Sequence, residues 1–223
     1  MPATLAAVYP ILDTASLERL NADPVTAAEA FLEGGAAILQ FRHKAFWSRD
    51  TFAQAEQIAQ LCRQFNAAFI VNDRADYAAL LGAGLHLGQH DLSPADARRV
   101  IGGSAMLGFS THNPAQMADA QDEPIDYVAF GPVFPTASKE RPDPATGIET
   151  LRAVRALTSK PLVAIGGITR ENAHLCWNAG ATSVAVIGDL LPVSFSVSGF
   201  TSSSDTKRAL RDRMTEWQQL TRR

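Results

Sequence analysis

The chain has 223 residues, of which 46% are hydrophobic and 19% charged, and its formal net charge at pH 7 is −3. This length and composition suit one globular α/β domain, and the mild negative charge excludes the broad basic surface typical of nucleic-acid binding. No apolar run reaches the roughly 18 residues of a membrane span, and no secretory leader is recognisable. We expect Cys62 and Cys176 to be buried thiols, as in a cytoplasmic protein.

Short apolar runs recur along the chain, with helical segments between them. The runs are continuous rather than alternating, which is typical of parallel strands covered on both faces. Eight strands alternating with helices over this length predict an α/β fold, a single (β/α)8 TIM barrel covering residues 1–223. An open doubly wound sheet is the alternative, but it usually has fewer strands at this length. The eight runs are residues 7–12, 36–41, 67–71, 85–88, 106–109, 127–131, 162–166 and 183–187.

Several helix boundaries have recognisable signals. Ser48 opens a long amphipathic stretch, and Ser93-Pro94 and Asn113-Pro114 each place proline directly after an N-cap side chain. Thr169 is expected to open a helix after the seventh strand. Residues 192–206 are Ser-rich and predict an extended loop before the last helix.

Two carboxylates follow neighbouring predicted strands. Asp73 comes directly after the third strand and Asp91 follows the fourth, so both lie at the same end of a parallel pair. Mg2+ commonly takes one or two carboxylates and leaves its other positions to water and phosphate oxygens. The pair therefore predicts a magnesium site, with simple capping of turns as the alternative.

Further anion-binding candidates follow the second and sixth strands. Gln40, Arg42 and Lys44 alternate along one strand and so project to the same side, where two cations suit a diphosphate. The alternative is a solvated strand end. The loop after the sixth strand offers a third cation and two hydroxyls, on Lys139, Thr136 and Ser138. Such a loop could close over a phosphate, although loops of this kind are common without that role.

A glycine pair follows the seventh strand. Gly166 and Gly167 allow backbone N–H groups to approach an anion closely, and the end of the eighth strand can supply more. Phosphate sites at this place recur in barrels of this type. The rim thus predicts two anion sites, one assisted by metal and one without metal, as suits a reaction that joins two phosphorylated substrates.

Six motifs together resemble the thiamine phosphate synthase family, in consistent order over about residues 8–190. They are Gln40-x-Arg42-x-Lys44, Val71-Asn72-Asp73-Arg74, His86-Leu87-Gly88-Gln89-x-Asp91, Gly108-x-Ser110-Thr111-His112, Gly131-Pro132-Val133-Phe134-Pro135-Thr136-x-Ser138-Lys139 and Ala164-Ile165-Gly166-Gly167-Ile168. The resemblance implies a transferase that couples a hydroxymethylpyrimidine diphosphate to a thiazole phosphate, giving thiamine monophosphate and diphosphate. It also implies a dissociative reaction, in which diphosphate leaves before the thiazole nitrogen attacks.

The resemblance assigns roles to individual residues. Mg2+ would be held against the diphosphate by Asp73 and Asp91. The same group would contact Arg42, Lys44, Asn72 and Lys139, and the pyrimidine would be placed by Gln40 and Ser110. The thiazole phosphate would be held by Thr136, Ser138, the Gly166 and Gly167 amides, and the backbone at Val186 and Ile187. Arg42, Ser110 and Lys139 are the implied catalytic residues.

The sequence departs from the family pattern in two places that bear on the site. The segment between Asp73 and Asp91 is one residue shorter than usual, which puts the metal pair in question. Gly188 stands where a serine is common, so one phosphate donor is missing. His112 is a candidate for proton transfer, but structural hydrogen bonding is the preferred interpretation.

Two other functions stay open at this stage. One is an isomerase of the same barrel group that aromatises the thiazole tautomer, and the other is a non-catalytic barrel that binds thiamine precursors. The intact set of charged rim residues favours the synthase. We expect small-molecule substrates, no nucleic acid or membrane partner and a cytoplasmic location, and the sequence leaves a homo-oligomer open.

Overall fold

The structure is a computed structural model that describes residues 5–136, 144–191 and 203–221. Its strands form one closed, entirely parallel barrel in the order β1 to β8, with β8 pairing back onto β1. The strands are β1 (Val8–Asp13), β2 (Ile38–Arg42), β3 (Ala68–Asn72), β4 (Gly84–Leu87), β5 (Leu107–Thr111), β6 (Tyr127–Phe130), β7 (Leu162–Ile165) and β8 (Ser183–Val186). Each lies within two residues of its predicted position, so the TIM-barrel prediction is confirmed.

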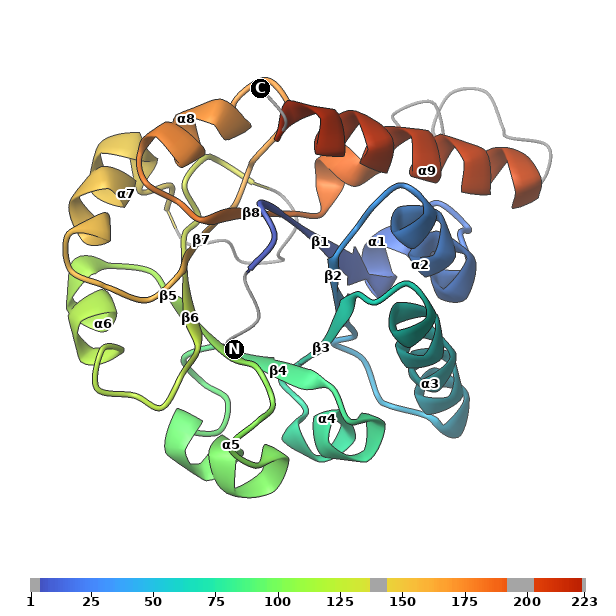
Figure 1. Cartoon of the computed structure of the whole chain (residues 1–223), viewed down its shortest axis with the longest axis horizontal. Helices are drawn as coiled ribbons and strands as arrows, with labels where there is room; N and C mark the ends of the chain where they lie inside the picture. Colours follow the sequence, from blue (N-terminus) through green and yellow to red (C-terminus); the bar gives the residue numbers. More distant parts are fainter. Residues whose placement is uncertain (1–4, 137–143, 192–202, 222–223) are drawn as a thin grey trace.

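Helices surround the barrel and cover its outer face (Figure 1). They are α1 (Thr14–Glu18), α2 (Pro24–Glu33), α3 (Arg49–Gln64), α4 (Ala75–Leu81), α5 (Pro94–Ile101), α6 (Pro114–Asp119), α7 (Gly147–Arg155), α8 (Ala173–Asn178) and α9 (Ser203–Leu220), with the 3-10 turn η1 (Gly188–Leu190). The predicted N-caps form: the side chains of Ser48, Ser93 and Asn113 each accept a hydrogen bond from the backbone three residues on. None of the described helices is long and apolar enough to cross a membrane.

Two boundaries differ from the prediction. Helix α8 begins at Ala173 rather than at Thr169, because residues 170–172 form a turn with Asn172 as the N-cap. The Asn172 side chain accepts from the Thr169 N–H at 2.8 Å and donates to the Gly167 carbonyl at 3.0 Å, which stabilises this turn. The last helix already begins at Ser203, so the end of the predicted 192–206 loop is helical, and residues 192–202 lie outside the described part.

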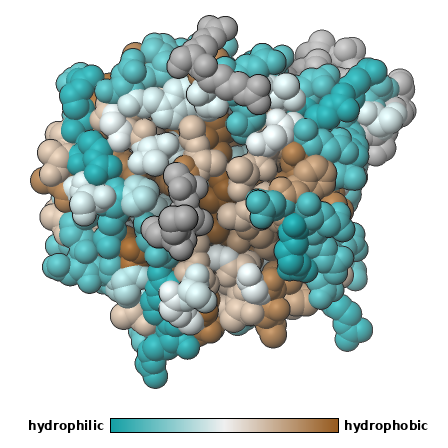
Figure 2. Space-filling model, viewed as in Figure 1, coloured by the Kyte–Doolittle hydropathy of each residue, from teal (hydrophilic) through white to brown (hydrophobic). Residues whose placement is uncertain are grey.

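Side chains alternate along each strand between two hydrophobic layers. On β1, Val8 and Leu12 face outward into the layer beneath the helices, while Tyr9 and Ile11 belong to a second cluster inside the barrel. Hydrophilic residues lie mainly over the peripheral helices, and more hydrophobic residues show towards the middle (Figure 2). Cys62 and Cys176 are buried free thiols, as expected.

Candidate active site

A cavity of about 370 Å³ opens at the C-terminal ends of the strands, where barrels of this type carry their chemistry. Most of the predicted site residues line it: Gln40, Arg42, Lys44, Asn72, Asp73, Ser110, Thr136, Gly166, Gly167, Val186 and Ile187. Asp91 is not part of the lining but is adjacent to Asp73. Ser138 and Lys139 lie outside the described residues. The strand order therefore gathers side chains from distant parts of the chain around one cavity.

The two carboxylates after β3 and β4 come together. The Asp73 N–H donates to the His86 carbonyl at 2.9 Å, which fixes Asp73 to the neighbouring strand. Asp91 turns back and accepts from the Gly88 N–H at 2.7 Å. Burial raises the pKa of Asp73, the Asp91 carboxyl within hydrogen-bonding distance adds to the rise, and Lys44 opposes it. The shorter segment between the aspartates does not separate them, because seven-residue helix α4 still returns the chain in register.

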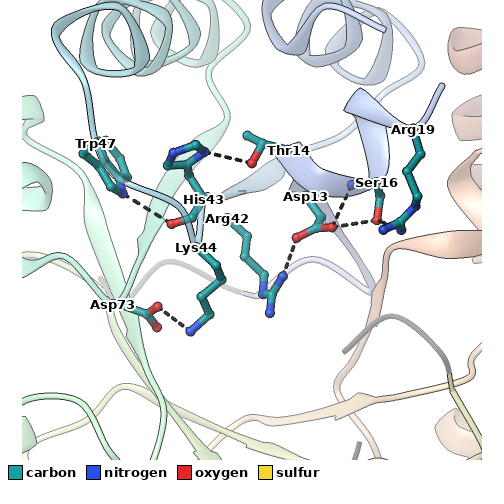
Figure 3. Close-up of polar contacts among 9 residues, drawn as sticks. All are labelled: Asp13, Thr14, Ser16, Arg19, Arg42, His43, Lys44, Trp47 and Asp73. Carbon is teal, nitrogen blue, oxygen red and sulfur yellow. Dashed lines mark hydrogen bonds and ion pairs between the residues drawn. The ribbon is translucent and has the colours of Figure 1, made fainter. Parts of the chain in front are cut away.

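Two cations from the end of β2 point into the same region (Figure 3). Lys44 Nζ lies 2.5 Å from Asp73 Oδ2, and its side chain remains 52% exposed. Arg42 forms an ion pair with Asp13, and its side chain is only 16% exposed. Arg42 is therefore fixed by its ion pair with Asp13, whereas Lys44 lies at the mouth of the cavity beside Asp73.

Asp13 is a buried partner of a predicted site residue that the sequence did not single out. Its side chain is 3% exposed, accepts from Ser16 N at 3.0 Å and Ser16 Oγ at 2.6 Å, and also pairs with Arg42. It caps α1 and orients Arg42 at once (Figure 3). A signal was present, because an aspartate at a strand end followed by Ser16 fits an N-cap. The pairing with Arg42 depends on the β1–β2 register, in which Asp13 lies opposite Arg42.

Asn72 brings a hydrogen-bond donor that the described residues do not satisfy. The residue is 6% exposed, and Asn72 Nδ2 has no partner within the described part of the chain. An unpaired buried donor is costly unless a ligand or water accepts from it. Asn72 lines the cavity beside Asp73, but Nδ2 itself is buried, so the amide would have to turn before it could donate to an anion there.

Both the backbone conformation and the close packing after β7 require glycine at positions 166 and 167. Gly166 and Gly167 have φ of +99° and +61°, which L side chains rarely adopt. A Cβ at Gly166 would lie 2.4 Å from Pro132 Cβ, and one at Gly167 would lie 2.4 Å from the Pro135 carbonyl oxygen. Close packing against the loop after β6 therefore requires these glycines independently of any ligand. Because α8 begins only at Ala173, the backbone here belongs to a turn rather than to a helix N-terminus.

A charged group beside this turn was also missed. Asp189 in η1 lines the cavity, and Arg170 Nε donates to its Oδ2 at 3.0 Å. Arg213 of α9 donates to the Asp189 carbonyl at 2.7 Å. Both arginines also pair with Glu216 of α9, so two cations and two carboxylates balance one another where a phosphate was predicted. Arg213 could not be placed here by reading the sequence, because it lies in the last helix.

Two polar residues of the lining, Tyr9 and His86, received no role from the sequence, and His112 was assigned structural hydrogen bonding as the preferred interpretation. Tyr9 and His86 occupy inward positions of β1 and β4, on the same alternation that places Gln40 inside, and that alternation was the available signal. His112 Nδ1 lies 2.6 Å from the Gly131 carbonyl oxygen, a hydrogen bond to backbone of the kind preferred from the sequence.

A closed parallel barrel whose C-terminal rim carries paired carboxylates, two cations and a glycine turn defines an enzyme of the TIM-barrel class that handles phosphorylated small molecules. Residues 8–190 match the family model described as thiamine monophosphate synthase. The chain belongs to this family.

Individual relatives agree with the family match. The chain is 49% identical to the thiamine-phosphate synthase of Koribacter versatilis over 165 residues, which cover 74% of this chain and 78% of that protein. It is 41% identical to the enzyme of the same name from Nitrosococcus oceani over 192 residues, covering 85% and 87% of the two chains. A solved thiamine phosphate pyrophosphorylase from Pyrococcus furiosus superposes with a TM-score of 0.73 at 30% identity, covering 94% of this chain and 95% of that one.

Proposed function

We propose that the rim cavity is the site at which this enzyme couples 4-amino-2-methyl-5-hydroxymethylpyrimidine diphosphate to a thiazole phosphate. The products are thiamine monophosphate and diphosphate, so the enzyme is a transferase of thiamine biosynthesis. The observation that carries the site assignment is the meeting of Asp73, Asp91 and Lys44 at one edge of the cavity, with Arg42 beside them. The proposal takes residues 1–223 as one barrel domain.

Magnesium fits the residues at this edge. Burial and the proximity of Asp91 both disfavour the charged form of Asp73, with Lys44 opposing them, and a divalent ion held by the two carboxylates would favour the charged form. Two carboxylates with open positions for phosphate oxygens are a usual Mg2+ donor set. We therefore assign Asp73 and Asp91 as ligands of Mg2+, which when bound would neutralise charge on the leaving diphosphate.

The other residues of this edge would hold the diphosphate and the ring. Lys44 can move from Asp73 to the diphosphate, because its side chain is half exposed. Arg42 is fixed by Asp13, and Asn72 Nδ2 supplies a further donor once the amide turns. We assign Gln40 and Ser110 to the pyrimidine, and Lys139 to the diphosphate as expected from its motif.

These residue types suit a dissociative substitution. The C–O bond between the exocyclic methylene and the diphosphate breaks, and its electron pair leaves with the diphosphate. The thiazole nitrogen then donates its lone pair to the methylene carbon and forms the new C–N bond. Stabilising the departing negative charge matters more in this reaction than a strong base, and no protein nucleophile is required.

The second anion site would hold the thiazole phosphate. We assign to it the backbone amides of Gly166 and Gly167, the Thr136 hydroxyl and the backbone of Val186 and Ile187, all of which line the cavity on its far side from β3. Ser138 is assigned by its motif alone. Arg170 pairs with Asp189 and with Glu216, so this cluster is neutral overall and the backbone donors carry the assignment.

The two alternative functions are disfavoured. An isomerase of the thiazole tautomer would have no use for paired carboxylates beside two cations, and the relatives compared are named as synthases. A non-catalytic barrel that binds the same precursors is disfavoured by the match to the synthase family and by relatives named as synthases. Both substrates are small molecules, and we place the enzyme in the cytoplasm, where its two free thiols are stable.

Product analysis tests the proposal directly. The purified protein is incubated with the pyrimidine diphosphate, the thiazole phosphate and Mg2+, and both products are quantified. We expect equal amounts of thiamine monophosphate and diphosphate, both abolished by EDTA and restored by excess Mg2+. Conversion of the thiazole tautomer without coupling would identify an isomerase instead, and neither activity would support the non-catalytic barrel.

A further inference from the structure

Five polar side chains form a continuous chain of hydrogen bonds across the inside of the barrel. Gln40 Nε2 donates to the Tyr9 hydroxyl at 3.0 Å. The Tyr9 hydroxyl lies 2.9 Å from the Tyr127 hydroxyl, which lies 2.9 Å from His86 Nδ1. His86 Nε2 in turn lies 2.9 Å from Ser110 Oγ. The chain begins and ends at Gln40 and Ser110, the two residues assigned to the pyrimidine ring.

The arrangement is built into the strands. In the sheet register, His86 of β4 lies opposite Gly108 of β5, and Gly108 lies opposite Tyr127 of β6. A Cβ at Gly108 would lie 2.0 Å from Tyr127 Cζ, so only glycine lets the phenol lie across β5. The rings of His86 and Tyr127 stack over it, with centroids 5.6 Å apart and planes at 23°. Gly108 therefore makes the contact possible.

The direction of the hydrogen bonds follows from counting protons. Tyr9 and Tyr127 are both 1% exposed, and burial raises the pKa of each phenol well above its usual value, so each keeps one proton to donate. Since Tyr9 accepts from Gln40, its own proton must go to Tyr127. The Tyr127 proton then goes to His86 Nδ1, and the proton on His86 Nε2 goes to Ser110 Oγ.

The opposite direction requires a turned Gln40 amide. If His86 carried its proton on Nδ1, it would donate to Tyr127, Tyr127 would donate to Tyr9, and Tyr9 would have to donate to Gln40 Oε1. The structure instead has Gln40 Nε2 against the Tyr9 hydroxyl. The orientation of the amide and the direction of the hydrogen-bonded chain are therefore coupled.

We infer that Tyr9, Tyr127 and His86 are positioning residues that fix the orientation of the Gln40 amide, and thereby select an amino group over a carbonyl on the bound pyrimidine. With Nε2 held by Tyr9, Gln40 presents its Oε1 as an acceptor for the exocyclic amine. Ser110, which accepts from His86, presents its hydroxyl proton to a ring nitrogen. This inference rests on the proposed function for the identity of the ring.

Tyr127→Phe tests the inference, because it removes one hydroxyl from the chain and keeps the ring. Tyr9 can then donate to Gln40 Oε1, the amide can turn, and its N–H can meet a carbonyl. We would measure binding of the 4-aminopyrimidine diphosphate and of its 4-oxo analogue by calorimetry with Mg2+. We expect the wild type to prefer the amino ring by about 10²-fold or more, and the variant to lose most of this preference.

Matched variants separate orientation from general disruption. Tyr77→Phe removes a phenol hydroxyl from α4 that is not part of the chain of hydrogen bonds, and this variant should keep the wild-type preference. His86→Gln retains an acceptor toward Tyr127 and a donor toward Ser110, so it should keep most of the preference, whereas His86→Leu should lose it. Thermal unfolding of each variant confirms that the barrel is folded.

The outcomes distinguish this inference from the proposed function. An unchanged preference in Tyr127→Phe, or no preference in the wild type, would overturn the inference. A wild type that prefers the amino ring but forms no thiamine monophosphate would contradict the proposed function and leave the inference standing. If the wild type couples the substrates but Tyr127→Phe keeps the wild-type preference, the proposed function stands and the inference is overturned.

Discussion

Asp73 occupies a backbone conformation that few residues other than glycine adopt. Its φ is +65°, in the left-handed region, where aspartate and asparagine are tolerated better than other side chains. This conformation at the end of β3 brings the carboxylate next to Asp91 and Lys44. Strain of this kind persists at functional sites when the surrounding structure enforces it.

Asp73→Asn should reduce Mg2+-dependent coupling by about 10²–10³-fold, because it removes a charged ligand from the diphosphate site. Asparagine tolerates the same backbone conformation, so the thermal midpoint should change little. Steady-state rates across a Mg2+ titration provide the measurement. Asp122→Asn, at an exposed loop position, is the matched control and should behave as wild type. Wild-type activity of Asp73→Asn at saturating Mg2+ would remove Asp73 from the metal site.

Asp13→Asn should raise the KM for the pyrimidine diphosphate several-fold while changing that for the thiazole phosphate little. Asparagine still caps α1, but Arg42 loses its charged partner, and the free energy of unfolding should fall by about 1.5–3 kcal/mol. Asp23→Asn is the control, since Asp23 caps α2 through the same two contacts, to Thr26 N and Oγ1, at an exposed position. Equal KM changes for both substrates would contradict the orienting role of Asp13.

At the residue scale, the sequence could predict that the charged and glycine candidates lie together at one rim, because each follows a strand end of a parallel barrel. Asp13 and Asp189 could not be assigned, because their roles depend on partners in other elements. The sequence also could not show that Gly166 and Gly167 are required by packing against the loop after β6.

The contact between α2 and α9 is the element-scale feature with the clearest consequence. A Cβ at Gly34, the C-cap of α2, would lie 2.7 Å from both the Arg211 carbonyl oxygen and Met214 Cβ of α9. Lys207 of α9 also pairs with Glu29 and Glu33 at 2.8 Å. The last helix is therefore held to the start of the barrel, as the adjacent ribbons in Figure 1 illustrate.

Gly34→Ala should lower the free energy of unfolding by about 1–3 kcal/mol, because the added methyl group has no room between the two helices. Gly34 has φ of −76°, so backbone strain does not contribute. Gly103→Ala is the matched control, since a Cβ there meets nothing within 4 Å. Denaturant unfolding of both variants makes the comparison, and equal stabilities would show that α9 adjusts freely against α2.

The sequence predicted which strands the barrel contains, but it predicted the helix boundaries less accurately. Continuous apolar runs located all eight strands, since parallel strands covered on both faces have this pattern. The predicted start of α8 at Thr169 was wrong. The Asn172 side chain stabilises a turn there, and the helix begins only after Asn172.

At the scale of the whole molecule, barrel closure brings together residues that are far apart in the chain. Tyr9 and Tyr127 are 118 residues apart, and their hydroxyls meet inside the barrel. Closure was predictable from the number and alternation of elements. The hydrogen-bonded chain was not, because it depends on strand register and on the space above Gly108.

The central claim is that one rim carries a metal-dependent diphosphate site and a metal-free phosphate site. Calorimetric titration of each substrate alone, with and without Mg2+, tests this claim most directly. We predict that the pyrimidine diphosphate binds measurably only with Mg2+ and that the affinity for the thiazole phosphate is the same with EDTA. If the binding of both ligands depends equally on Mg2+, or if the binding of neither depends on it, the division of the rim into two sites is contradicted.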